Sequence, residues 1–356
     1  MATLFGTSFT RKEILSHVGD LSQVAGIRLM RLSEGKEADL RVADFRTGSG
    51  LRFQVNLDRG MDISMAEYRG VPLAWRSPVG DVHPAYFEPE GLGWLRSFPG
   101  GLMTGCGLTQ VGAPSEDEGQ RLGLHGRLSH TPATDIQTNT RWEGDDCLFR
   151  LEGAVREFTM FGENLLLERA VEATLGRSSL LLRDRVRNEA DRTTPLMLLY
   201  HINVGWPILA EGSRLVMHSR TTEPRDRRAE AGLSEATRFS RPIPRFSEQV
   251  YYHDLVPDGN GRVSVALVNG ELRLGLYLSY SLDELPRFTE WKMLGEGTYV
   301  LGMEPANCRV GGRAAERAAG TLQHLEPGEE RHFSLEIGIL DGPDEIERFQ
   351  QEHALR

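Results

Sequence analysis

The sequence predicts an all-β protein with few short helices. Many segments alternate apolar and polar residues with the two-residue period of a half-buried strand. Glycine and proline, 39 and 17 of the 356 residues, fall between these segments. Helical patterns are rare and do not alternate with the strands, which argues against Rossmann and TIM-barrel folds.

The expected elements can be followed along the chain. A short helix is expected at residues 11–18 and another at residues 344–353. Well over a dozen strands are expected between them, and the clearest alternating segments are residues 51–57, 148–155, 262–268, 272–278 and 332–340. Residues 80–97, rich in glycine, proline and aromatic residues, predict an ordered active-site loop. Residues 223–246, rich in Arg, Glu and Pro, predict a long solvated excursion or a lid.

The chain is expected to form one domain over residues 1–356, with residues 1–20 as an N-terminal segment. Hydrophobic residues make up 39% of the sequence, which permits a sizeable core, and no change in composition divides it. No apolar run approaches the length of a transmembrane helix. The first residues lack the basic start and apolar stretch of a secretory signal.

The charge of the chain limits its expected partners, and its cysteines indicate the expected cellular setting. The 41 basic and 51 acidic side chains give a net charge of −10, so neither nucleic acid nor an anionic membrane is an expected partner. Cys106, Cys147 and Cys308 are too scattered for a disulfide framework or a structural zinc site. A reduced, cytoplasmic setting is therefore expected.

Three short stretches place an acid–base group where a strand is expected to end. His125 lies in residues 123–127, His201 in residues 199–207 and Glu304 in residues 302–307, each beside glycine, proline or aromatic residues. Binding groups often occupy such positions on a rigid sheet. These three side chains are the candidate catalytic residues.

The same stretches resemble aldose 1-epimerases (galactose mutarotases). The strand ending in Asn188, then Pro195 and His201, is similar to that family's histidine motif, and Glu304 before Pro305 is similar to its catalytic glutamate. The element around His125 resembles its other histidine motif. Residues 58–63 and 100–108 resemble an uncharacterised aldose-1-epimerase-like branch, a domain of unknown function. The resemblance implies an antiparallel β-supersandwich with a small-molecule carbohydrate on its concave face, and a homodimer is a possible assembly.

The implied chemistry is the interconversion of sugar anomers through the open-chain aldehyde. Glu304 would take the C1 hydroxyl proton and His201 would protonate the ring oxygen, from opposite sides of the C1–O5 unit. His125 would hydrogen-bond the ring oxygen or a neighbouring hydroxyl. This reaction needs no metal ion and no organic cofactor.

Further residues are candidates for sugar binding. Three of them are basic: Arg59, Arg127 and Lys292. If two of these side chains reach the groove, the sugar is expected to be anionic. Alternatively, they pair with nearby carboxylates, or Arg59 anchors the turn at Gly60. His253 or Asp254 is expected to contact sugar hydroxyls. The other two candidates are Asn203, which offers an amide group, and Trp291, which offers an aromatic surface for stacking on the sugar.

Two other functions remain open at the level of sequence. One is a carbohydrate-binding protein without catalysis on the same scaffold. The other is a sugar epimerase or lyase in which a divalent metal is held by three histidines and one glutamate, namely His125, His201, His253 and Glu304.

Overall fold

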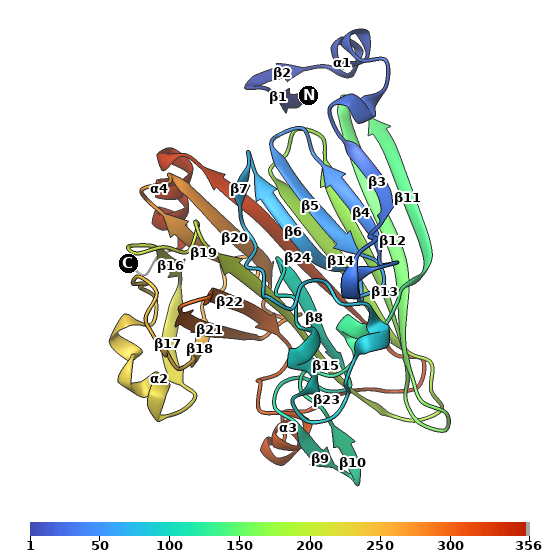
Figure 1. Cartoon of the computed structure of the whole chain (residues 1–356), viewed down its shortest axis with the longest axis vertical. Coiled ribbons are helices and arrows are strands. Elements are labelled where there is room, and N and C mark those ends of the chain that lie inside the picture. Colours follow the sequence, from blue (N-terminus) through green and yellow to red (C-terminus); the bar gives the residue numbers. More distant parts are fainter. Residues whose placement is uncertain (354–356) are drawn as a thin grey trace.

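The computed structural model describes residues 1–353 and consists mainly of two large sheets (Figure 1). Strands within both sheets pair antiparallel. The prediction of an antiparallel all-β protein is therefore confirmed. Two hairpins stand apart from these sheets: β1 (Ala2–Leu4) with β2 (Thr7–Phe9), and β9 (Ser115–Asp117) with β10 (Gln120–Leu122).

The first large sheet has eight strands, most of them long. In spatial order they are β11 (Thr134–Glu143), β12 (Asp146–Phe158), β13 (Asn164–Thr174), β14 (Ser179–Asn188), β24 (Glu330–Asp341), β20 (Leu274–Ser281), β19 (Arg262–Asn269) and β16 (Arg214–Met217).

The second large sheet has twelve strands and carries two of the three candidate catalytic residues, His201 and Glu304. Its main path is β17 (Ser219–Pro224), β18 (Gln249–Leu255), β21 (Arg287–Gly295), β22 (Thr298–Ala306), β15 (Thr194–Gly205), β8 (Met103–Leu108), β6 (Asp62–Tyr68), β5 (Leu51–Asn56), β4 (Arg41–Arg46) and β3 (Gly26–Arg31). Two short strands complete it: β7 (Val71–Pro72) pairs with β6, and β23 (Gln323–Leu325) pairs with β15.

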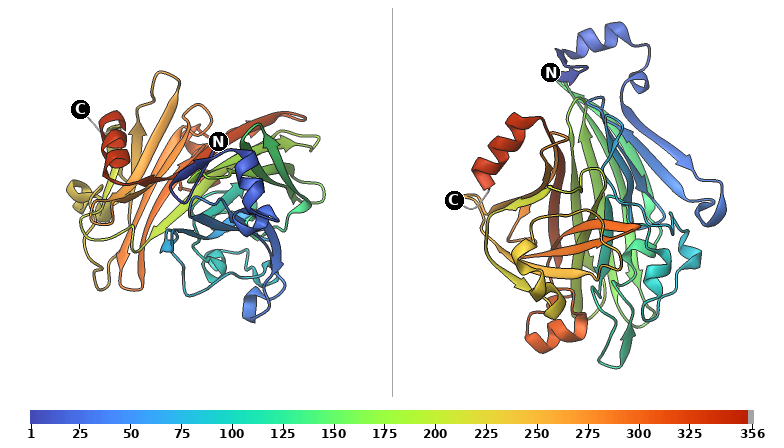
Figure 2. Two further views of the ribbon diagram at one scale, coloured as in Figure 1. Left: turned by 90° about the horizontal axis from the view of Figure 1, so that it is seen from above. Right: turned by 60° about the vertical axis from the view of Figure 1, so that its left-hand side comes forward.

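The main core lies between the two sheets. Along β12, buried residues such as Phe149 and Leu151 alternate with more exposed ones, as the pleat of a strand requires. They belong to one cluster with Phe45 of β4 and Tyr200 of β15 from the other sheet. Figure 2 shows β3–β6 in blue beside the green strands β11–β14.

A buried ion pair of the first sheet also binds a tyrosine of the second sheet. Arg169 of β13 binds Asp184 of β14 through two hydrogen bonds, Nε to Oδ1 at 2.8 Å and Nη2 to Oδ2 at 2.6 Å. The Tyr200 hydroxyl of the second sheet donates to Asp184 Oδ2 at 2.7 Å. The charged side chains of this pair are inaccessible to solvent. Each depends on the other because a buried charge needs a partner.

The predicted helices are present as α1 (Arg11–His17) and α4 (Pro343–His353). Two further helices, α2 (Arg227–Ala231) and α3 (Arg313–Ala319), were not predicted. In residues 1–353, no helix combines the length and apolar character needed to cross a bilayer.

The five alternating segments all correspond to strands, and two boundaries differ: Leu57 follows the end of β5, and β20 starts late. Strand β20 begins at Leu274, not at residue 272. Residues 270–273 instead form the turn after β19, where the Asn269 side chain accepts hydrogen bonds from the backbone N–H groups of Glu271 and Leu272. An asparagine side chain that caps a turn in this way competes with strand formation.

Candidate active site

A cavity of about 370 Å³ brings His125, His201 and Glu304 together. Its size suits a small molecule. A larger hollow of about 910 Å³ lies near the N-terminal hairpin and α4, but none of these three side chains lines it. We take the smaller cavity as the candidate site because its walls carry the groups for acid–base chemistry.

Strand register places His201 opposite Glu304. Strands β15 and β22 pair Ile202 with Met303, so the residues one step outward, His201 and Glu304, face each other across the two strands. Gly302 occupies the next position of β22 on the same side. A Cβ atom there would come within 2.7 Å of Glu304 Oε1, so glycine leaves room for the carboxyl group.

His201 and Glu304 contact each other directly, with 3.1 Å between Nε2 and Oε1. A sugar cannot lie between groups this close, so the expectation that they act from opposite sides of the ring is wrong. Both side chains are almost fully buried. Burial, and then the nearby charge of Glu248, raises the pKa of Glu304 to about 8. Burial, and then His125, lowers the pKa of His201. At neutral pH both groups are uncharged.

His125 is held in one tautomer by the backbone. Its Nδ1 accepts a hydrogen bond from the N–H of Gly112 at 3.3 Å, so the neutral ring carries its hydrogen on Nε2. Burial lowers the pKa of His125 to about 4, which keeps the ring neutral at ordinary pH. Gly112 is required here, since a Cβ atom would lie 2.2 Å from the carbonyl oxygen of Val310. His125 is thus placed as a neutral hydrogen-bond donor.

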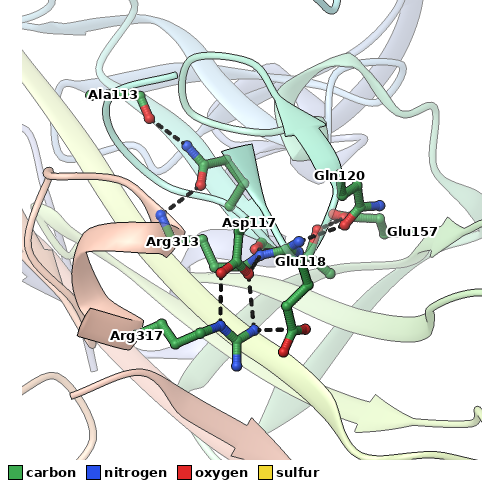
Figure 3. A network of polar contacts seen from close by, with 9 residues as sticks. Ala113, Asp117, Glu118, Gln120, Glu157, Arg313 and Arg317 are labelled. Atoms are coloured by element: carbon green, nitrogen blue, oxygen red, sulfur yellow. Dashed lines mark hydrogen bonds and ion pairs between the residues drawn. The ribbon is translucent and has the colours of Figure 1, made fainter. Parts of the chain in front are cut away.

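A network of hydrogen bonds and ion pairs connects residues 110–117, near His125, to helix α3, which follows β22. Figure 3 shows Arg313 and Arg317 of α3 directed at Asp117 of β9, each with an Nε to carboxylate distance of 2.7 Å. The Gln110 side chain accepts from the N–H of Arg313 at 2.8 Å and donates to the carbonyl of Ala113 at 2.7 Å. Ala113 lines the cavity. The network therefore holds this wall in place relative to Glu304 on β22.

Aromatic rings form much of the cavity wall. Trp94 stacks on Phe98 with ring centroids 4.5 Å apart, and Trp291 lies 5.3 Å from the ring of His201. Three buried polar atoms of the lining residues have no hydrogen-bond partner: Trp94 Nε1, His201 Nδ1 and Thr289 Oγ1. Buried polar groups are normally paired. The aromatic wall suits a ligand with apolar C–H faces, and a sugar has such faces.

Two lining residues, Arg225 and Glu248, were not predicted. Glu248 Oε2 accepts from the indole N–H of Trp291 at 2.9 Å, and its Oε1 accepts from Arg225 Nη2 at 2.9 Å. From the sequence, His253 or Asp254 on the following strand was expected to contact sugar hydroxyls. Glu248, one residue before β18, is the acid in this region that reaches the cavity.

Arg59 and Lys292 lie outside the cavity, so their assignment to ligand binding is wrong. Both are buried, and both donate to backbone carbonyls. Arg59 binds the carbonyls of Val82 and Ser97. The Lys292 ammonium lies 2.6 Å from the carbonyl of Arg238 and also donates to two more carbonyls in the segment predicted to be a lid. That segment is therefore anchored at this point, contrary to the expected solvated excursion.

Three other predicted binding residues also lie outside the cavity lining. Arg127 is exposed. Asp254 lies at the surface, 3.4 Å from Arg220 Nη1. Asn203 is buried and donates to the carbonyl of His201 at 2.9 Å, so it braces the strand. Of the predicted binding residues, Trp291 lines the cavity.

His253 is used elsewhere in the fold. Its Nε2 lies 2.9 Å from Glu290 Oε2, and its Nδ1 lies 3.0 Å from Thr222 Oγ1, outside the cavity lining. The predicted alternative in which it shares a metal ion with His125, His201 and Glu304 is therefore wrong. Within the described residues, no three His, Cys, Asp or Glu side chains are grouped so that they could hold a metal ion.

Known structures share this fold. A candidate aldose 1-epimerase from Klebsiella pneumoniae is 28% identical, with 92% of this chain and 86% of that chain covered and a TM-score of 0.88. A galactose mutarotase-like protein from Clostridium acetobutylicum is 13% identical over 90% of this chain and 99% of that one, with a TM-score of 0.61. A galactose 1-epimerase from Lactobacillus acidophilus is 14% identical over 90% and 100%, with a TM-score of 0.58.

These similarities define the class of protein: it has the galactose mutarotase-like β-sandwich fold of the aldose 1-epimerase-like superfamily. Residues 37–339 match the family model described as "Domain of unknown function (DUF4432)", and the chain belongs to that family. No curated protein matches the sequence. The resemblance found in the sequence is confirmed for the fold and the superfamily.

Proposed function

We propose that this protein is a carbohydrate-active isomerase that interconverts the anomers of an aldose. The observation that carries the proposal is the direct contact of 3.1 Å between His201 Nε2 and Glu304 Oε1 in a small cavity with aromatic walls. The similarity to proteins described as aldose 1-epimerases supports it.

The contact suggests that His201 and Glu304 work as one proton relay. In the neutral pair, we place the proton of Glu304 on Oε1, 3.1 Å from His201 Nε2, and the one hydrogen of the His201 ring nitrogens on Nδ1. The C1 hydroxyl of the sugar gives its proton to the second oxygen of Glu304. The shared proton moves to Nε2 while Nδ1 protonates the ring oxygen. The C1–O5 bond breaks as the C1 carbonyl forms, and the reverse steps close the ring after rotation.

Such a relay suits a buried site because no net charge develops on the pair. Charge separation in a dry cavity costs much more free energy than in water. His125, with its hydrogen on Nε2, donates a hydrogen bond to a sugar oxygen during the reaction. Trp94 and Trp291 pack against the C–H faces of the sugar.

Activity is tested by dissolving a pure anomer of each candidate aldose and following its conversion by NMR with and without the protein. The proposal expects a rate above the spontaneous background for at least one aldose. Binding without any acceleration would instead show that the protein is a carbohydrate-binding module. Absence of both binding and acceleration across a broad panel of aldoses would refute a sugar site.

We expect the rate to depend on pH with a plateau between about 4 and about 8. Above pH 8, Glu304 loses the proton that the relay shares, so the rate falls. Below pH 4, His125 becomes charged and the rate falls again. The measurement is kcat/KM across this range, corrected for the spontaneous reaction at each pH. A rate that rises steadily from pH 7 to pH 9 would contradict the assignment of a proton to Glu304.

We expect an uncharged sugar to bind better than an anionic one. Among the described residues lining the cavity, Arg225 is the one Arg or Lys, and it already binds the carboxylates of Asp226 and Glu248. A further anion would meet Glu248 without a free cation to compensate it. Calorimetry with a hexose, its uronate and its 6-phosphate should show roughly tenfold or greater preference for the hexose. Equal or tighter binding of either anion would overturn this expectation.

A further inference from the structure

Arg59 holds both ends of the segment that carries part of the cavity wall. Its side chain is 1% exposed and lies in the turn between β5 and β6. Nη1 donates to the carbonyl of Val82 at 2.7 Å, and Nη2 donates to the carbonyl of Ser97 at 2.9 Å. The fourteen residues between these two carbonyl-bearing positions, 83–96, include Leu92, Trp94 and Leu95, which line the cavity.

His130 reinforces the same anchor. Its Nε2 lies 2.7 Å from the hydroxyl of Ser97 and 3.3 Å from Arg59 Nη2. Phe87, in the middle of the segment, stacks on the His130 ring with centroids 3.9 Å apart and an angle of 8° between the planes. The segment is thus held at its two ends and near its centre by side chains from other parts of the chain.

The segment has little regular structure of its own. It contains two short 3-10 turns, Pro84–Tyr86 and Gly93–Ser97, and no strand. A loop without a hydrogen-bonded ladder opens easily unless side chains hold it. Trp94 packs against His125 with centroids 4.8 Å apart, so the position of this loop also decides the surroundings of His125.

Arginine is well suited to this task. Its planar guanidinium donates in several directions at once and can bridge two carbonyls that lie far apart in the sequence. Lysine keeps the charge but presents a single nitrogen. Burial lowers the pKa of Arg59, and the nearby charges of Asp62 and Asp81 partly oppose that effect. A buried charge without a carboxylate in direct contact is costly, which indicates that the two carbonyl contacts matter to the structure.

We propose that Arg59 is a positioning residue that fixes residues 83–96 as a preformed wall of the sugar site. Arg59 contacts neither His201 nor Glu304, and it lies outside the cavity lining. Its effect on ligand binding therefore passes through the loop. This part of the inference rests on the proposed function, but the anchoring of the loop does not.

The test uses the full-length protein with Arg59→Met and the milder Arg59→Lys, which keeps the charge. Arg76→Met is the matched control, because Arg76 pairs with Asp81 at 2.7 Å beside the same loop but binds neither anchored carbonyl. Hydrogen exchange by mass spectrometry is measured without ligand. Both Arg59 variants should exchange roughly ten- to a hundredfold faster in residues 83–96, as expected from losing hydrogen bonds of a charged donor. Exchange in β15 and β22 should stay unchanged.

Kinetics with an accepted aldose complete the test. The Arg59 variants should raise KM roughly tenfold or more and change kcat by less than about threefold, because binding is affected and the proton relay is not. Unchanged exchange in residues 83–96, or equal loosening by Arg76→Met, would overturn the anchor. Faster exchange with an unchanged KM would overturn its role in binding. If wild type accelerates no aldose, the proposed function fails, while the exchange data still decide whether Arg59 anchors the loop.

Discussion

Replacing Glu304 with glutamine is expected to slow anomer interconversion by roughly 10²–10⁴-fold, the usual contribution of a positioned acid–base group. The glutamine side chain has the same shape and can still contact His201, which lies 3.1 Å away in the wild type. It cannot give up or accept a proton as a carboxyl group does. Affinity for the sugar should change far less than the rate. Following a freshly dissolved anomer by polarimetry or NMR measures the rate.

Glu248→Gln is the matched control for this substitution. It makes the same chemical change in the same cavity, but Glu248 binds Trp291 and Arg225 and does not contact His201 in the structure. We expect it to alter KM and leave kcat within a few fold. His201→Asn should resemble Glu304→Gln, and the double variant should lose less than the product of the two single losses. Wild-type rates in both single variants would show that the relay is assigned to the wrong residues.

Arg169→Met is expected to destabilise the protein by about 3–5 kcal/mol, the typical cost of removing one partner from a buried ion pair. The substitution leaves the carboxylate of Asp184 buried, with the Tyr200 hydroxyl as its remaining neutral donor. The free energy of unfolding is measured by urea denaturation, with fluorescence and circular dichroism as two probes of the transition.

Arg183→Met provides the comparison for the buried pair. Arg183 lies on β14 one residue before Asp184, but its side chain is 56% exposed in its ion pair with Glu172. Exposed pairs contribute about 0–1 kcal/mol, so this variant should remain close to wild type. Equal destabilisation by the two substitutions would contradict the larger contribution expected of the buried pair.

Much of the fold could be predicted from short stretches of sequence. The alternation in residues 148–155 follows from the pleat of β12, and the capping pattern of Thr10 with Glu13 marks the start of α1. Helices α2 and α3 were missed. Helix α2 lies in a charged segment with little apolar periodicity, and α3 has no side-chain cap at its start, unlike α1 of the same length. Contacts with other segments stabilise such short helices.

The candidate site was predicted in part. The order of the motifs led to His125, His201, Glu304 and Trp291, which line one cavity. Arg225 was not predicted as a site residue because it lies in a charged segment in which apolar residues do not recur at regular spacing. Two glycines of the site lie where other atoms come too close for a side chain: Gly302 beside Glu304, and Gly112, whose N–H binds His125. These glycines are a sequence signal that was not used.

The sequence by itself determined the β architecture and indicated the three candidate acid–base residues, because strand periodicity and short motifs are properties of neighbouring residues. Only the tertiary structure decided how the polar side chains are used. The register of β15 with β22 brings His201 into contact with Glu304 instead of leaving room for a sugar between them. The carbonyls around Arg59 and Lys292 come from segments at least 23 and 54 residues away, and they turn two expected ligand-binding cations into internal anchors. A side chain's partners depend on which distant segments fold against it.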